Sequence, residues 1–427
     1  MGWLDIFKSS KATSLPAKQE LLNNSKVFCM AAWVHQHVAV HGEIFPCCLS
    51  AHYLQEALGD LKQGDTILEA WNSDRSKQLR LNMLDNKKSK LCGLCYKYEE
   101  LGKESTRHQM NDQFKHLFNR VEEMNPDGSM PHHELAYLDI RLSNLCNFKC
   151  RICSHYFSSK WYDDAKAMGM INEGFNRMVY PAENLDNFWE QLEPVLPKLE
   201  KVHFAGGEPL ILDNHYKILQ YFIDNGLTHV KLSYNTNFSD FVLKGQDAME
   251  MWKHFDTIYL CASLDGAGKR GEYMRKGQNW DKVITERKRM LAVAPHILFE
   301  LTPTISIMNV WHFPDFYREW VDEGLMQPHE MNIYLLFEPD YYNIRRLPKN
   351  FKEKVKAKYH EFIENYIKPM GKKGEKAKGH FEYIIRYMHE DDQAMSKEFY
   401  TYNQKLDEMR NEKMEDVFPE LKEILLP

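Results

Sequence analysis

Leu142-Ser-Asn-Leu-Cys-Asn-Phe-Lys-Cys-Arg-Ile-Cys153 is the stretch that decides the fold. It places Cys146, Cys150 and Cys153 within eight residues, in the spacing CxxxCxxC. Thiolates are soft ligands that bind zinc or iron–sulfur clusters. A closed structural zinc site needs four ligands, whereas three thiolates leave one iron of a 4Fe–4S cluster open. The stretch therefore predicts a 4Fe–4S cluster at which a further molecule can bind.

Strand-like and helical segments alternate from this stretch onward. Strands are expected at 136–142, 201–205, 229–234, 257–264, 298–304 and 331–337, and helices at 158–167, 186–196, 214–225, 246–255, 280–294 and 313–323. Six βα units in a row predict an α/β fold with a parallel sheet, curled into a partial (βα)6 TIM-like barrel. Sites in such folds lie at the carboxyl ends of strands, and CxxxCxxC directly follows the first strand.

A glycine-rich turn follows the second expected strand. Gly206 and Gly207 allow a close approach of main chain to a ligand, and Glu208 offers a carboxylate suited to an ammonium group. A helix N-terminal carboxylate is the structural alternative for Glu208. The turn therefore predicts a binding site for an amino group.

The fourth expected strand ends in a second polar group of residues. Ser263 and Asp265 share one face of this strand by alternation, and their short polar side chains suit a ribose. Arg275, a little further on, suits a carboxylate, although a surface ion pair is the alternative for a single arginine. Turn residues are the alternative for Ser263 and Asp265. An ammonium, a ribose, a carboxylate and an open iron together point to S-adenosylmethionine.

With these motifs, the chain from about 135 to 340 resembles the radical S-adenosylmethionine superfamily. The resemblance implies that the methionine part of the cofactor chelates the open iron, that the glycine turn and Glu208 hold its amino group, and that Ile152 packs near the adenine. It also implies that one electron cleaves the cofactor to methionine and a 5′-deoxyadenosyl radical, which removes a hydrogen atom from a substrate. The protein binds, orients and shields these partners.

A second set of cysteines precedes this core. Cys29, Cys47, Cys92 and Cys95, together with a hairpin at 32–45, resemble the SPASM or twitch auxiliary-cluster modules of the same superfamily. The resemblance implies a second 4Fe–4S cluster with four thiolate ligands; a zinc site with the same ligands is the alternative. Cys48 either replaces Cys47 as a ligand, donates a hydrogen atom, or is a buried thiol. In most relatives the module follows the core, whereas here it precedes it.

The elements of the upstream module and of the C-terminal part are also predicted. Alternating apolar residues around Gly42 predict the hairpin, and a helix is expected at 67–84 with a break at 72–74. CxxC is expected in a tight turn. The lysine- and glycine-rich segment 371–379 is expected to be a flexible linker between helices.

Length and composition bound the remaining alternatives. The 427 residues, 43% of them hydrophobic and 27% charged, suggest two or three globular domains. We expect a flexible N-terminus at 1–25, the auxiliary module at 26–125, the radical core at 130–345 and a helical extension at 346–427. A net charge of -6 argues against nucleic acid as partner. An odd count of nine cysteines, with no export signal or long apolar run, predicts a cytoplasmic protein without disulfides or membrane contact.

The substrate is the least determined feature of the sequence. Relatives with auxiliary clusters modify peptides by crosslinking, epimerisation or oxidation, so a peptide or protein substrate is expected. A small-molecule dehydrogenase or epimerase and a non-catalytic binding protein are the alternatives. Cys261 shares the face of Ser263 and Asp265, where its thiol would donate a hydrogen atom to a substrate radical; core packing is the alternative. Flavodoxin or ferredoxin is the expected electron donor.

Overall fold

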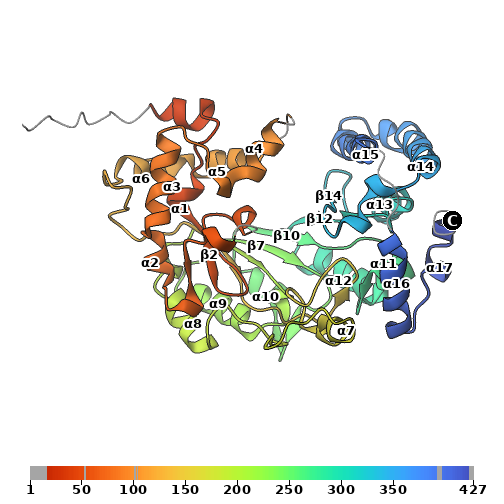
Figure 1. The fold of residues 1–427 in the computed structure, drawn as a ribbon, viewed down its shortest axis with the longest axis horizontal. Helices are drawn as coiled ribbons and strands as arrows, with labels where there is room; N and C mark the ends of the chain where they lie inside the picture. Colours follow the sequence, from red (N-terminus) through yellow and green to blue (C-terminus); the bar gives the residue numbers. More distant parts are fainter. Residues whose placement is uncertain (1–16, 52–53, 101, 103, 392–396, 423–427) are drawn as a thin grey trace, which may run out of the picture. The chain divides into compact units, whose positions relative to one another are not determined.

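The computed structural model describes residues 17–51, 54–100, 102, 104–391 and 397–422 (Figure 1). The chain forms two compact units: unit 1 is 1–139 with 187–199, and unit 2 is 140–186 with 200–427. Strand β4 (Tyr137–Arg141) has residues in both units. Within the described ranges, no helix is both long enough and apolar enough to cross a bilayer.

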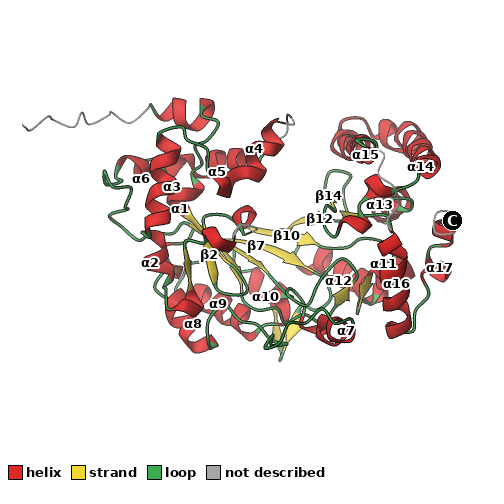
Figure 2. Cartoon of the chain, viewed as in Figure 1, coloured by secondary structure: helices red, strands yellow, loops and turns green. Residues whose placement is uncertain are grey.

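A parallel sheet lies at the centre of unit 2 (Figure 2). Its strands follow the order β12-β10-β7-β6-β4, with β6 (Lys201–Ala205), β7 (Lys231–Thr236), β10 (Ile258–Ala262) and β12 (Leu298–Leu301). The pairs β6–β7, β7–β10 and β10–β12 are parallel. The α/β class with a parallel sheet is therefore confirmed.

The sixth expected strand differs from the prediction. Only β14 (Tyr334–Leu335) forms there, and it pairs in parallel with β13 (Thr304–Ile305) in a separate small sheet. A single parallel bridge joins Leu301 to Met331. The proline at 303 lacks an N–H and interrupts the fifth strand, which accounts for the split into β12 and β13. The six-stranded partial barrel remains a prediction.

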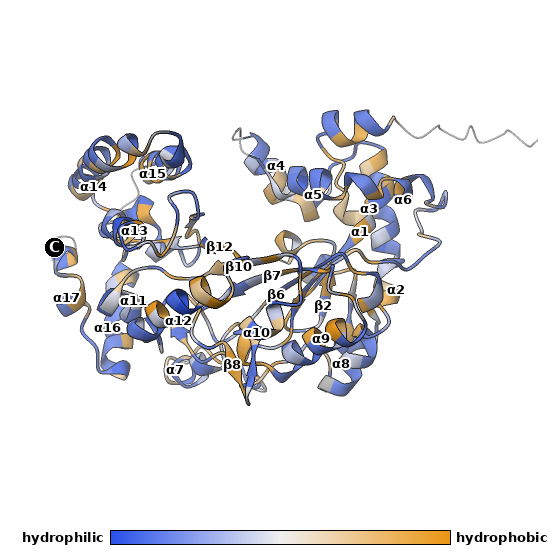
Figure 3. Ribbon diagram, turned by 180° about the vertical axis from the view of Figure 1, so that it is seen from behind, coloured by the Kyte–Doolittle hydropathy of each residue, from blue (hydrophilic) through white to orange (hydrophobic). Residues whose placement is uncertain are grey.

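Helices cover one face of this parallel sheet. The helices with side chains packed on this face are α9 (Asp213–Asp224), α10 (Ala248–Trp252), α12 (Trp280–Val293) and α13 (Phe313–Asp322). Unit 2 also contains α7 (Tyr162–Ala167) and α11 (Gly268–Met274), whereas α8 (Leu185–Leu192) lies mostly in unit 1. On the covered face, Phe204 packs against His215 of α9, and Phe299 packs against Trp320 of α13. The helices carry apolar residues among polar ones, as Figure 3 shows. This amphipathic pattern buries the sheet on one side.

The opposite face of the same strands stays open. Tyr259 and Leu298 lie opposite each other in register and are 42% and 51% exposed. On the neighbouring strands His203 lies opposite Ser233, and its ring is 3.0 Å from the Ser233 hydroxyl. Because side chains alternate along a strand, Cys261 lies on this open face with Tyr259.

Unit 1 contains the expected hairpin, but its first strand begins only at His35, because residues 32–34, predicted as strand, belong to helix α1 (Ala31–Val34). Strands β1 (His35–Val38), β2 (Glu43–Phe45) and β3 (Gly59–Asp60) pair antiparallel in the order β4-β1-β2-β3. Helix α1 comes directly before the hairpin. The helices after it are α2 (Ile67–Trp71), α3 (Asp74–Leu84), α4 (Gly93–Glu100), α5 (Thr106–Phe114) and α6 (Asn119–Glu122). Thr66 and Glu69 form a capping box at the start of α2, and the Ser73 side chain caps α3. The break expected at 72–74 is confirmed.

Two local expectations are wrong. CxxC does not form a tight turn: Cys92 ends a short 3₁₀ helix and Cys95 lies in α4, because Ser89 caps this helical segment through the Leu91 N–H. The segment 371–379 is no flexible linker, since a 3₁₀ helix ends at Gly374 and continues into α15. Lys376 in this segment forms an ion pair with Glu300 at 2.7 Å.

The C-terminal part of unit 2 is helical, as expected. It contains α14 (Lys349–Phe362), α15 (Glu375–Met388), α16 (Lys397–Arg410) and α17 (Met414–Val417). Two short antiparallel ladders complete the unit: β5 (Lys149–Cys150) with β11 (Arg275–Lys276), and β8 (Val242–Leu243) with β9 (Gln246–Asp247). Of the flexible N-terminus expected at 1–25, residues 1–16 lie outside the described part, and Glu20–Asn24 form a helical turn. The four-part domain division stays a prediction.

Candidate functional site

The CxxxCxxC loop of unit 2 holds its three thiols close together. Cys150 lies in β5 opposite Arg275, and its carbonyl accepts hydrogen bonds from the Cys153 N–H at 3.0 Å and the Trp161 ring N–H at 2.7 Å. Burial, reinforced by the charge of the neighbouring Cys150 thiolate, raises the pKa of Cys146 and also raises that of Cys153, to about 12. The loop therefore presents one buried cysteine, Cys146, and two half-buried ones, Cys150 and Cys153, close enough for their charges to interact.

The glycine turn after β6 lies directly against this loop. The Gly207 N–H donates to the Ser143 carbonyl at 2.9 Å, and the Glu208 N–H donates to the Leu145 carbonyl at 2.8 Å. A Cβ at Gly207 would lie only 2.0 Å from the Leu145 oxygen, and Gly206 has φ +121. Both glycines are therefore required by the close approach of two main-chain segments.

The Glu208 carboxylate is buried and accepts hydrogen bonds from three groups of this chain. They are the Leu210 N–H at 3.1 Å, the Thr236 hydroxyl at 2.8 Å and the Asn237 N–H at 2.6 Å. Burial raises its pKa to about 7 despite these donors. The Asn237 side-chain amide lies 3.9 Å from the Cys146 sulfur, so the carboxylate and the cysteine loop share one polar site. The contact of Glu208 with an amino group remains a prediction.

Asp265 and Arg275 are engaged with each other. Their side chains form a buried ion pair at 2.8 Å, and Asp265 also accepts the Thr304 N–H at 2.9 Å. A second nitrogen of Arg275 lies 3.9 Å from the Cys150 sulfur. The structure thus gives each residue a partner that the sequence did not indicate. The contacts of Asp265 with a ribose and of Arg275 with a carboxylate remain predictions. The contact of half-buried Ser263 with a ribose remains a prediction as well.

The two remaining expected residues of unit 2 are half-buried. Ile152 lies between two motif cysteines. Cys261 lies in register with Asn235 and Glu300 on the neighbouring strands. Burial, together with the Glu300 carboxylate, raises the pKa of Cys261 to about 12. Its thiol is therefore neutral at pH 7 and carries the hydrogen that a donor needs.

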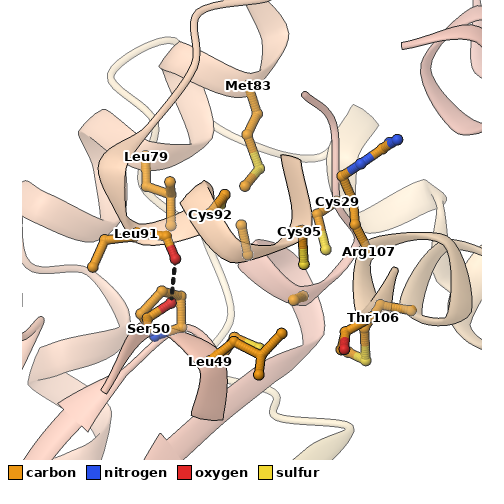
Figure 4. A pocket seen from close by; sticks show the side chains of 15 residues that line it. Cys29, Leu49, Ser50, Leu79, Met83, Leu91, Cys92, Cys95, Thr106 and Arg107 are labelled. Carbon is orange, nitrogen blue, oxygen red and sulfur yellow. Dashed lines mark hydrogen bonds between the residues drawn. The ribbon is translucent and has the colours of Figure 1, made fainter. Parts of the chain in front are cut away.

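Unit 1 contains a separate cavity lined by four thiols (Figure 4). The thiols belong to Cys29, Cys47, Cys92 and Cys95, whereas Cys48 does not line this cavity. Burial raises the pKa of Cys92 to about 12 and raises that of Cys29 further. The geometry therefore favours Cys47 over Cys48 as the fourth member of the set.

The rest of this cavity is apolar, with hydrogen-bond donors at the sulfurs. Leu79, Met83, Leu91 and Met110 line it. The Arg107 main-chain N–H donates to Cys95, and its guanidinium donates to the Phe28 carbonyl at 3.0 Å, next to Cys29. Figure 4 shows Arg107 beside Cys29 and Cys95. Buried thiolates with N–H donors in an apolar shell are the surroundings that iron–sulfur clusters use.

Sequence reasoning missed three residues of these sites. Asn237 follows β7, so its position at a strand end was a usable signal. Arg151 lies inside the cysteine motif, but its role depends on distant partners. Arg107 had no signal in the sequence, because it reaches Cys95 and Phe28 only through folding.

A comparison with known protein families agrees with the upstream cysteine set. Residues 29–96 match the SPASM family, an iron–sulfur cluster-binding domain. A curated relative, 7,8-dihydro-6-hydroxymethylpterin dimethyltransferase of Methanocaldococcus jannaschii, is 27% identical over 159 residues, which are 36% of this chain. The match spans only 27% of that relative's length.

Two solved structures illustrate the structural similarity. One, anSMEcpe with bound AdoMet, is 15% identical with a TM-score of 0.37, over 53% of this chain and 61% of the other. Another, Streptococcus suis SuiB bound to S-adenosylmethionine, is 13% identical with a TM-score of 0.37, over 66% of this chain and 61% of the other.

The motifs of unit 2 and the matched domain of unit 1 point in the same direction. CxxxCxxC after the first strand and the glycine turn packed against it are similar to the motifs of radical S-adenosylmethionine enzymes, and such a loop fits a 4Fe–4S cluster with S-adenosylmethionine. Residues 29–96 match the SPASM iron–sulfur family, so the upstream cysteines belong to a domain of that family.

Proposed function

We propose that this protein cleaves S-adenosylmethionine with one electron and uses the resulting 5′-deoxyadenosyl radical to remove a hydrogen atom from a substrate. The observation that carries the proposal is the loop of Cys146, Cys150 and Cys153, which is hydrogen-bonded to the turn at Gly207 and Glu208. In this arrangement the three thiolates would hold a 4Fe–4S cluster in which one iron has no protein ligand. Flavodoxin or ferredoxin is the proposed electron donor.

The residues around this loop have distinct proposed roles. Glu208 and the glycine turn would bind the amino group of the cofactor, Ile152 its adenine, and Ser263 its ribose. The Asp265 carboxylate forms a buried ion pair with Arg275, so it would have to accept a hydrogen bond from the ribose while it stays paired with Arg275. Arg275 would hold the cofactor carboxylate with the nitrogens that Asp265 leaves free.

A peptide or protein is the proposed substrate class. The uncovered face of the parallel sheet supports it, because Tyr259 and Leu298 expose about half of their surface there. Aromatic and aliphatic side chains on an open sheet face can contact an extended chain over several residues. The proposed modification is a crosslink, an epimerisation or an oxidation. This face would be the inner wall of the proposed partial barrel.

Cys261 is the proposed hydrogen donor for an epimerisation. It lies on the same open face as Tyr259, and its thiol is protonated at pH 7. Transfer of its hydrogen atom to a substrate radical would leave a sulfur radical, which one electron from the external donor and one proton from water would restore to the thiol. Core packing is the competing role of this half-buried side chain.

A small-molecule substrate is the second candidate. The match of 159 residues to a relative named as a pterin dimethyltransferase favours it. Such a substrate would need an enclosed pocket, whereas a peptide needs an open surface. Competition between a peptide library and small cyclic substrates for the same radical, read by mass spectrometry of the products, would separate the two.

The decisive experiment is anaerobic and uses the full chain. The protein is reconstituted with iron and sulfide, reduced with dithionite and incubated with S-adenosylmethionine, and 5′-deoxyadenosine is measured. We expect its formation in the native protein and its loss in the triple variant Cys146→Ala, Cys150→Ala, Cys153→Ala. Absence of 5′-deoxyadenosine from protein with about eight irons per chain would refute the enzyme and leave a binding protein.

A further inference from the structure

Arg151 is an unusual residue of the cysteine motif because its charge is buried. It lies between Cys150 and Cys153, and its side chain is 0% exposed. A buried guanidinium is costly unless it is fully paired. Its partners therefore show which other parts of the chain hold the loop in place.

The partners of Arg151 come from the C-terminal helical segment. One nitrogen donates to the Asn403 side chain at 3.1 Å in α16, and another donates to Glu412 at 2.8 Å and forms an ion pair with Asp407. The guanidinium also stacks on the Tyr273 ring, with its carbon 3.6 Å from the ring centroid. A residue of the cluster loop is thus held by a helix some 250 positions later in the sequence.

A second connection runs beside the first. Arg410 at the end of α16 has a fully buried side chain and pairs with Asp164 at 2.8 Å. Asp164 in turn pairs with Lys149 at 2.8 Å, in the strand that carries Cys150. Lys276, opposite Lys149 in register, pairs with Glu412 at 2.9 Å.

The strand that carries Cys150 has little regular backbone pairing. The ladder of β5 with β11 is two residues long, and the Arg151 N–H adds one bond to the Met274 carbonyl at 2.8 Å. So short a ladder is a weak restraint on a loop that must hold three sulfurs. The paired arginines supply charge-assisted bonds, which are stronger and more directional.

We propose that helix α16 clamps the cluster-binding loop, with Arg151 as the positioning residue. The clamp fixes the sulfurs of Cys150 and Cys153 through Arg151, and the strand before them through Arg410 and Asp164. This inference goes beyond the proposed reaction and rests on the assignment of these cysteines as ligands. It gives the C-terminal extension the task of retaining the cluster.

The test measures iron retention and needs no turnover. Native protein, Arg151→Met and Asp407→Asn are reconstituted anaerobically, and the release of iron to a chelator is followed by absorbance. Loss of an outer partner of a metal ligand typically weakens metal binding 10–100-fold, so we expect roughly tenfold faster release or more. Arg177→Met is the matched control, since Arg177 pairs with Asp163 in the same unit but is 47% exposed.

The outcomes separate a clamp from general unfolding. With a clamp, about four irons leave quickly, about four stay with the cysteines of unit 1, and the far-UV circular dichroism is unchanged. Should Arg151→Met not fold, the milder Asp407→Asn decides. Native release rates in Asp407→Asn, or equal loss of both clusters from it, would overturn the proposal. The result is independent of 5′-deoxyadenosine formation, so failure of the proposed reaction is seen separately.

Discussion

Replacing Gly207 by alanine tests the contact between the glycine turn and the cluster loop. The added methyl carbon would lie 2.0 Å from the Leu145 oxygen, 2.6 Å from the Leu145 carbonyl carbon and 2.7 Å from that of Asn144. All three are main-chain atoms, so no side chain can rotate away. Ordinary contact begins near 3.4 Å, and the two segments would have to separate by about 1.4 Å.

Two effects of different size follow from this separation. Overpacking of this kind costs about 1–3 kcal/mol of stability. A displacement of about 1 Å in an active site can lower the rate about 100-fold. Because the displaced segment ends at Cys146, we expect Gly207→Ala to form 5′-deoxyadenosine at about a hundredth of the native rate while it stays folded. The assays are anaerobic turnover and urea unfolding.

Gly379→Ala is the matched control for this change. Gly379 lies in α15 of the same unit, and a Cβ there would meet no atom within 4 Å. Alanine in an open helical position stabilises by about 1 kcal/mol, so this variant keeps native turnover. Native turnover in Gly207→Ala as well would show that the turn does not position the cluster loop, and would refute the reasoning.

Three further predictions follow from single side chains. Cys47→Ser removes about four irons per chain while Cys48→Ser keeps them, because only Cys47 lines the cavity of unit 1; the reverse result in metal analysis would exchange the two roles. Burial lowers the pKa of His215 to about 3, so its unfolded form binds the extra proton and stability falls as the pH drops below about 6.5. Between pH 7 and pH 5 we expect the native protein to lose about 2 kcal/mol more stability than His215→Gln in urea unfolding, and equal losses in the two proteins would contradict this. With Cys261→Ala, deuterium from D₂O should no longer enter an epimerised product, and unchanged incorporation measured by mass spectrometry would exclude Cys261 as donor.

Local motifs made much of unit 2 predictable. The strand at 201–205 and the helices at 214–225, 280–294 and 313–323 agree with β6, α9, α12 and α13 to within one residue. These segments have strong apolar periodicity and capping residues such as Asn279, whose side chain caps α12. Predictions were wrong where capping or pairing was decided by other residues. The segment 371–379 looks like a linker by composition, yet it folds as helix and pairs with β12 through Lys376.

The sequence by itself indicated which residues of this protein can hold a cluster and its cofactor. Cys146, Cys150 and Cys153 lie in one short loop, so their spacing alone encodes a ligand set, and the glycines of the next turn encode close approach. Only the tertiary structure decided which of Cys47 and Cys48 faces the cavity, and that Arg151 is held by α16. Cys47 and Cys48 are neighbours, so their sequence spacings to the other ligands differ by only one residue and cannot tell them apart. Arg151 and its partners lie some 250 positions apart and meet only through packing, which no local sequence pattern encodes.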